Sequence, residues 1–254
     1  MRKQISTRVV RNPGKRLFDR ANVARDHGKY SEAEMLYRKS LLARKKAPGP
    51  NGAAIAQSMN FLANLLTEQR RYEEAEPLYK ESLNLRRKVH GPRHRDVASS
   101  LSNLANLFQD TGRFAEAERL YRQSLNLRKK AYGPRHEQVA MCLSNIAILM
   151  QTTGRKAQAE AHFRRALRML AETAGSDHHL TAFTKANFAD FLRLTGRSAE
   201  AHPIAEDALK DLRRALPKGH RYVGWASEVL NNVLVPPGSS NDTVPDKPSS
   251  RKRP

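Results

Sequence analysis

The chain has 254 residues, with 46 lysines and arginines against 25 aspartates and glutamates, so its formal net charge is +21. Apolar residues make up 39% of it, a share too low for a globular domain with one thick core. No apolar run approaches the 18 residues that a membrane span needs, so the sequence predicts no membrane partner. The single cysteine, Cys142, excludes an internal disulfide and a cysteine-based zinc site, and it favours a reducing, cytoplasmic compartment.

Residues 1–13 are basic and contain no acid. We expect them to be a basic lead-in to the first helix. The arginine-rich composition leaves an organellar targeting peptide open as the alternative.

A seven-residue segment recurs along the chain with a period of 42 residues. It starts at positions 28, 70 and 112, with weaker copies at 154 and 196. Two further anchors keep the same register: Asn-Leu-Ala at 103–105 returns as Asn-Ile-Ala at 145–147, and Gly-Pro-Arg-His at 91–94 returns at 133–136. Three anchors in one period predict a repeat architecture.

Each period is typical of two amphipathic helices. Leu101, Leu104 and Phe108 follow the spacing of a helical stripe, and Gly112 ends that helix. The second helix ends at Gly133-Pro134, and a short connection makes the two helices antiparallel neighbours. We expect a repeat domain over 14–235, with hairpins at about 14–48, 52–90, 94–132, 136–174 and 178–215 and a capping helix at 220–234. The Pro, Gly and Ser-rich segment 236–254 is predicted to be a disordered basic tail.

These residues resemble a known family. The Gly-x-Tyr-x-x-Ala turn at 28–33 and the paired helices are similar to tetratricopeptide repeats, and Glu-Ala-Glu-Pro-Leu-Tyr at 74–79 is similar to the kinesin-light-chain-type subclass. The resemblance implies an all-α fold, a right-handed α-solenoid of about five repeats. Arg70 and Lys185 depart from the pattern at a turn glycine and at an apolar position. No heptad coiled coil precedes the repeats, so we expect no motor-subunit role.

Six asparagines on the first helices are candidates for holding a peptide backbone in the concave groove that such solenoids present. They are Asn60, Asn64, Asn103, Asn106, Asn145 and Asn187. Asparagine has no propensity advantage inside a helix, so its recurrence needs a cause. Hydrogen bonds between repeats are the alternative cause, and the resemblance favours the groove.

Basic clusters recur in the last turn of the second helices, where the helix dipole stabilises cations. We expect Arg86, Arg87, Lys88, Arg128, Lys129 and Lys130 to form a basic stripe along one edge of the solenoid. Like charges in a stripe repel one another, which favours an acidic partner.

The histidines at 94, 136, 178 and 220 lie one repeat apart, too far from one another to share a metal ion. We predict that each helps to begin the following helix, and we predict no metal site and no cofactor. No phosphate-binding glycine loop, nucleophile elbow or carboxylate pair indicates an enzyme. Cys142 is expected to be an inert core residue.

The sequence thus predicts a non-catalytic scaffold that binds an acidic peptide or protein segment in the groove. The alternative is nucleic-acid (RNA) binding along the basic stripe, which has few exposed aromatic side chains for stacking. The sequence leaves the oligomeric state open.

Overall fold

The structure is a computed structural model, and it describes residues 13–234. The predicted basic tail lies outside the described residues, and so does the predicted basic lead-in except for its last residue. That residue, Pro13, begins the first helix.

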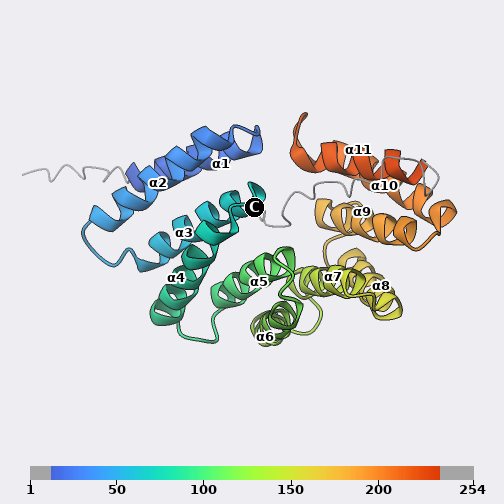
Figure 1. Ribbon diagram of the computed structural model, residues 1–254, viewed down its shortest axis with the longest axis horizontal. Helices are drawn as coiled ribbons and strands as arrows, with labels where there is room; N and C mark the ends of the chain where they lie inside the picture. The colour runs from blue at the N-terminus through green and yellow to red at the C-terminus, as the bar shows by residue number, and fades with distance from the viewer. Residues whose placement is uncertain (1–12, 235–254) are drawn as a thin grey trace, which may run out of the picture.

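Eleven α-helices form the described part of the chain, and residues 13–234 contain no strand. In chain order the helices are α1 (Pro13–Asp26), α2 (Tyr30–Lys46), α3 (Gly52–Glu68), α4 (Tyr72–His90), α5 (Arg95–Asp110), α6 (Phe114–Tyr132), α7 (Glu137–Thr152), α8 (Lys156–Thr173), α9 (His179–Leu194), α10 (Ser198–Ala215) and α11 (Arg221–Leu234). Each odd-numbered helix up to α9 pairs with the next one, and each pair packs on its neighbour along a curve (Figure 1). The prediction of an all-α solenoid is confirmed.

Histidine side chains cap the starts of four helices. The Nδ1 atoms of His94, His136 and His178 accept the backbone N–H two residues later, at 3.2, 3.1 and 3.4 Å. His220 accepts the N–H of Tyr222 at 3.2 Å, at the start of α11. These bonds satisfy amide donors that the first turn of a helix leaves unpaired. The prediction that these histidines help to begin the following helices is confirmed.

The turn inside each pair needs a left-handed backbone. Gly112 has a φ of +76° at this turn, whereas Arg70 takes the same position in the second pair with a φ of +60°. Among the non-glycine residues between 13 and 234, Arg70 alone has a positive φ. The departure from the repeat pattern at position 70 therefore leaves the turn geometry unchanged.

Small residues lie where the helices approach each other most closely. Ala63, Ala105, Ala147 and Ala189 in the first helices are fully buried, as are Ala75, Ala117, Ala159 and Ala201 in the second helices. Bulky rings at one repeat position fill the space beside them: Tyr37, Tyr79, Tyr121 and Phe163. The fifth pair has Ala205 at the ring position, but its alanines continue the same packing, so the core is a continuous layer along the solenoid.

Lys185, at a normally apolar position of α9, is explained by two aspartates of α10. Its ammonium pairs with Asp207 and, at 3.0 Å, with Asp211. Burial lowers the pKa of Lys185, but the bonds to the two carboxylates outweigh burial and hold it above the usual range. The charge therefore stays paired at the edge of the core.

Ion pairs join successive helix pairs at the starts of the second helices. Arg113 donates to Glu76 of the preceding pair at 3.0 Å and to Glu116 of its own helix at 2.7 Å. The contact with the preceding pair recurs with Arg71, Arg155 and Arg197, which pair with Glu34, Glu118 and Glu160. We call these four inter-pair contacts the arginine ladder.

The C-terminal helix α11 closes the last pair. Trp225, Val229 and Val233 are buried against the preceding helices, and the Trp225 ring lies 5.1 Å from that of Phe183. This apolar cover is what an open solenoid end requires. Between residues 13 and 234, every helix is too short or too polar to cross a membrane.

Figure 1 shows the solenoid curving until α11 faces α1 across the hollow side. Glu68 at the end of α3 joins the two ends: its Oε1 lies 3.2 Å from Arg25 of α1 and 2.9 Å from Arg221 of α11. The three side chains are 0–12% exposed. We call Arg25, Glu68 and Arg221 the closing triad, because it links the two ends of a fold whose repeats usually contact only their neighbours.

Candidate functional site: the concave groove

The hollow side of the solenoid contains a cavity of about 760 Å³, which we call the concave groove. Its walls come from the first helices α1, α3, α5 and α7, from the ends of α4 and α6, and from the starts of α9 and α11. Side-chain amides dominate one wall: Asn22, Gln57, Asn60, Asn64, Asn103, Asn106, Gln138 and Asn145. Apolar contact surface comes from Phe18, Phe61, Met141, Leu216 and Tyr222. The groove thus combines hydrogen-bonding groups with apolar surface, as binding sites do.

Asn60, Asn103 and Asn145 lie at this wall in three successive first helices. The Nδ2 of Asn103 donates to the Oδ1 of Asn60 at 2.9 Å, so this amide also joins α5 to α3. Asn145 is half-buried, and its side chain forms no hydrogen bond with the residues that the structure describes. Asn145 is therefore the candidate amide that keeps its full bonding capacity for a ligand.

Asn64 and Asn106 line the groove but also serve the hairpin. The hydroxyl of Tyr79 donates to the Oδ1 of Asn64 at 2.6 Å, and Tyr121 donates to Asn106 in the same way. A third pair, Tyr37 and Asn22, has the same geometry at 2.6 Å. Sequence reasoning missed Asn22, although the tyrosine that follows each of these asparagines by 15 positions could have revealed the series.

Asn187 does not line the groove, which corrects its placement from the sequence. Asn187 is fully buried, and its side-chain Nδ2 donates to the carbonyl oxygen of Phe183 in its own helix at 2.9 Å. Helix α11 packs on α9, the helix that carries Asn187. Asn187 therefore belongs to the core.

Arg86 and Arg128 are buried, which corrects their placement on an exposed stripe. Arg86 donates to the carbonyl of Asp96 at 2.9 Å and to Ser100 Oγ at 3.0 Å, so it joins α4 to the next first helix. Arg128 donates to Gln138 Oε1 at 2.7 Å and to Ser124 Oγ at 3.2 Å. Burial lowers the pKa of both guanidinium groups. Both side chains line the groove instead.

The remaining members of the predicted stripe lie at the surface. Arg87, Lys88 and Lys130 are exposed, and Lys129 is half-buried. The exposed basic surface at these two helix ends is therefore narrower than the sequence suggested.

Cys142 is a packed residue of α7. It is fully buried, and its thiol donates to the carbonyl oxygen of Tyr121 with 3.6 Å between sulfur and oxygen. A thiol that is fully buried in the core is expected to be unreactive and to contribute only to packing.

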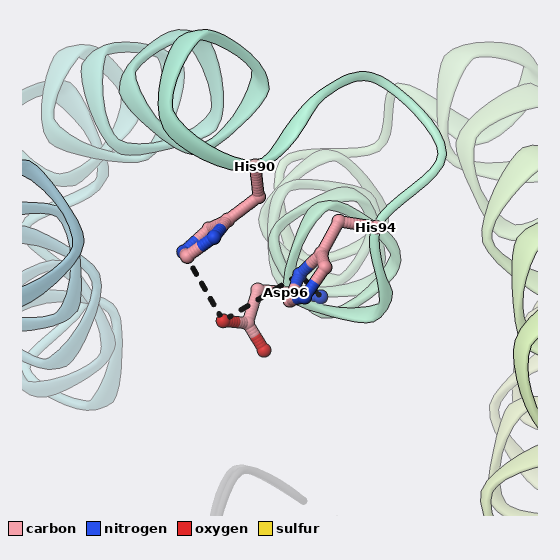
Figure 2. Close-up of side chains that lie close together, drawn as sticks. All are labelled: His90, His94 and Asp96. Atoms are coloured by element: carbon pink, nitrogen blue, oxygen red, sulfur yellow. Dashed lines mark hydrogen bonds and ion pairs between the residues drawn. The ribbon is translucent and has the colours of Figure 1, made fainter.

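A cluster that sequence reasoning missed lies where α4 meets α5. Figure 2 shows His90, His94 and Asp96 pointing toward one another across the link between the helices. Asp96 Oδ2 lies 3.7 Å from His90 Nε2 and 3.8 Å from His94 Nδ1. The spacing His-x-x-x-His-x-Asp, present in the 90–96 segment, was the available signal.

A family model for the tetratricopeptide repeat matches the chain four times, over residues 16–88, 54–130, 96–172 and 158–214. The chain belongs to the tetratricopeptide repeat family. A comparison of this tetratricopeptide repeat protein with curated protein sequences finds no match.

Solved structures show the same fold. BtubC (BKLC) from P. vanneervenii is 20% identical, with a TM-score of 0.63 over 82% of this chain and 84% of that one. A putative kinesin light chain from Podospora anserina with TPR-like repeats is 18% identical, with a TM-score of 0.59 over 80% of this chain and 97% of that one. A Rap protein complexed with competence and sporulation factor is 11% identical, with a TM-score of 0.69 over 87% of this chain and 64% of that one. The fold is thus that of kinesin-light-chain-like repeat proteins.

Proposed function

We propose that this tetratricopeptide repeat protein is a non-catalytic scaffold that binds an extended, acidic segment of a protein partner in the concave groove. Its family and fold support a role in protein interaction. A Rap neighbour of the same fold was solved in complex with the Phr* peptide, which supports a peptide as the ligand class.

The observation that carries the proposal is that Asn145 and Arg128 both line the groove. An extended peptide has an unpaired N–H and C=O at each residue, and an asparagine amide can serve both. The side-chain amide of Asn145 forms no hydrogen bond with the described residues. It can therefore bind a peptide without breaking an existing contact.

The acidic character of the partner follows from the two groove arginines. Arg86 and Arg128 are 8% and 4% exposed, and neither forms an ion pair within residues 13–234. A buried cation without a carboxylate is costly, and a carboxylate supplied by a ligand relieves that cost. The groove therefore selects aspartate or glutamate side chains over neutral ones.

A peptide-display selection against the immobilised full chain tests this function. We expect the selected peptides to be enriched in Asp and Glu, and we expect Asn145→Ala to lower their affinity about tenfold with unchanged helical circular dichroism. Asn126→Ala is the matched control, because Asn126 is exposed on α6 and does not line the groove. Equal losses for both variants, or selected peptides without acidic enrichment, would contradict the proposal.

The alternative is RNA binding along the surface cations Arg87, Lys88, Lys129 and Lys130, of which Lys129 is half-buried. Counterion release would then make affinity fall steeply with salt. Fluorescence anisotropy with a single-stranded RNA oligonucleotide at two salt concentrations separates the alternatives: binding that is lost in Arg87→Gln/Lys88→Gln and kept in Asn145→Ala would favour RNA. We propose a cytoplasmic location, because the single buried thiol suits a reducing compartment.

A further inference from the structure

We propose that His90, His94 and Asp96 form a binding site for a divalent transition-metal ion of the zinc type. One ligand atom from each residue lies within 4.8 Å of the other two. Two imidazole nitrogens and a carboxylate oxygen are donors that zinc accepts, whereas magnesium and calcium prefer oxygen alone.

The spacing of these atoms is close to that of a coordinated ion. Bonds of about 2.0–2.2 Å to one tetrahedral centre place ligand atoms roughly 3.4 Å apart. Asp96 Oδ2 lies 3.7 Å from one histidine nitrogen and 3.8 Å from the other. Because the three side chains are 25–44% exposed, small rotations can close these gaps and water can fill the remaining coordination position.

Asp96 is available as a ligand. In a chain with a large excess of cations, its ion-pair partners within residues 13–234 are the two histidines, and no lysine or arginine pairs with it. Figure 2 shows its carboxylate beside the two stacked rings, with dashed lines to both histidines. The Asp96 carboxylate therefore has the two imidazole rings, and no lysine or arginine of the described residues, within ion-pair distance.

The next repeat shows that the fold does not need this ligand set. There, Tyr132 stacks on His136 with ring centroids 4.4 Å apart, as His90 stacks on His94 at 4.3 Å. Gln138 takes the position of Asp96, and His136 still caps its helix. Capping therefore needs only the shared histidine, and stacking needs any aromatic ring at the position of His90. Neither requires an imidazole at position 90 or a carboxylate at position 96, so His90 and Asp96 add two possible ligands at this link.

Metal binding through His94 Nδ1 has a local cost. That nitrogen accepts the backbone N–H of Asp96 at 3.2 Å in the absence of a metal. The ion takes the same lone pair and displaces this cap, so the amide of Asp96 reports directly on binding.

The test is a titration of the full chain, without an affinity tag, with Zn²⁺ in competition with a chromophoric chelator. We expect one equivalent to bind, with affinity at least tenfold weaker in His90→Tyr or Asp96→Gln and lost in the double variant. These changes copy the next repeat, so they preserve the fold. His202→Gln, which alters a half-buried histidine near Glu206, is the matched control and should bind as the parent chain does.

A second measurement locates the ion. The Asp96 amide resonance should shift on Zn²⁺ addition, and Co²⁺ should give visible absorption bands that the double variant lacks. Equal binding by the parent chain and the double variant would show an adventitious ion only, and absence of binding by the parent chain would overturn the proposal as well.

Discussion

The hydroxyl of Tyr79 donates a hydrogen bond to the amide oxygen of Asn64 across a helix hairpin, with 2.6 Å between the two oxygens. Both side chains are at most 1% exposed. The pair recurs as Tyr37 with Asn22 and Tyr121 with Asn106. In the fourth hairpin both members change together, to Phe163 and Ile148. The asparagine is present in each hairpin that has the tyrosine, which indicates that the hydroxyl and the amide oxygen satisfy each other's hydrogen bond.

Replacing Asn64 by Ala should destabilise the protein by about 1–3 kcal/mol, because a buried hydroxyl loses an acceptor. The double variant Asn64→Ile/Tyr79→Phe copies the fourth hairpin and should recover much of that loss. Urea unfolding of Asn64→Ile, Tyr79→Phe and their double variant measures the coupling between the two positions. Additive effects would contradict the pairing, and Asn126→Ala on the exposed face of α6 should change the midpoint little.

Acid should weaken the arginine ladder. Hydrogen bonds from Arg197 and then Arg164 hold the pKa of Glu160 below its usual value of 4.5. A lowered pKa in the folded state adds stability above the unfolded-state pKa, and that stability is lost as the pH falls through the folded-state value. Glu160→Gln should therefore be less stable than the parent chain at pH 7, by up to about 1 kcal/mol after solvent screening.

This difference between the two proteins should close as the pH falls from about 5 to 2, because protonated Glu160 no longer pairs with arginine. Thermal unfolding at a series of pH values measures it. Glu172→Gln is the control, since Glu172 is exposed and forms no ion pair with the described residues. A gap that persists at pH 2 would assign the effect to packing instead.

Most of the fold could be predicted from the 42-residue repeat period. Gly112 and Gly133 ended the predicted helices within two residues of the ends of α5 and α6, because glycine stops a helix locally. The placement of Asn187 was wrong because helix periodicity cannot show that α11 covers α9. We expected Arg86 at the surface because a helix C-terminus favours cations there. Its long side chain instead extends to the start of α5, where it donates to the carbonyl oxygen of Asp96. Contacts between the two ends of the solenoid depend on small rotations summed over all pairs, which no single repeat encodes.

Replacing Glu68 by Gln should destabilise the protein by about 3–5 kcal/mol, because two buried arginines lose their shared counter-charge. The link between the two ends should weaken too, so the radius of gyration from small-angle X-ray scattering should rise. Glu73→Gln is the control, since Glu73 is exposed on α4 and unpaired within the described part of the chain. A variant with parent-like stability and an unchanged radius would show that the triad does not hold the ends.

The turn glycine offers a paired test of backbone strain. Gly112→Ala should cost about 1–2 kcal/mol, because position 112 has a φ of +76° and an added Cβ meets nothing within 4 Å, so the cost comes from the backbone alone. The same change at Gly224, inside α11 and with equal free space, should stabilise by about 1 kcal/mol. Urea midpoints that move in the same direction would contradict this explanation.

The closing triad also limits how this protein can change over generations. Solenoids usually lengthen or shorten by copying or deleting whole units, since each unit depends only on those beside it. Here an inserted unit would carry Arg221 away from Glu68 and leave buried charges without their counterpart. The number of units and these three charges are therefore physically coupled, and we expect a natural variant of different length to lack all three charges.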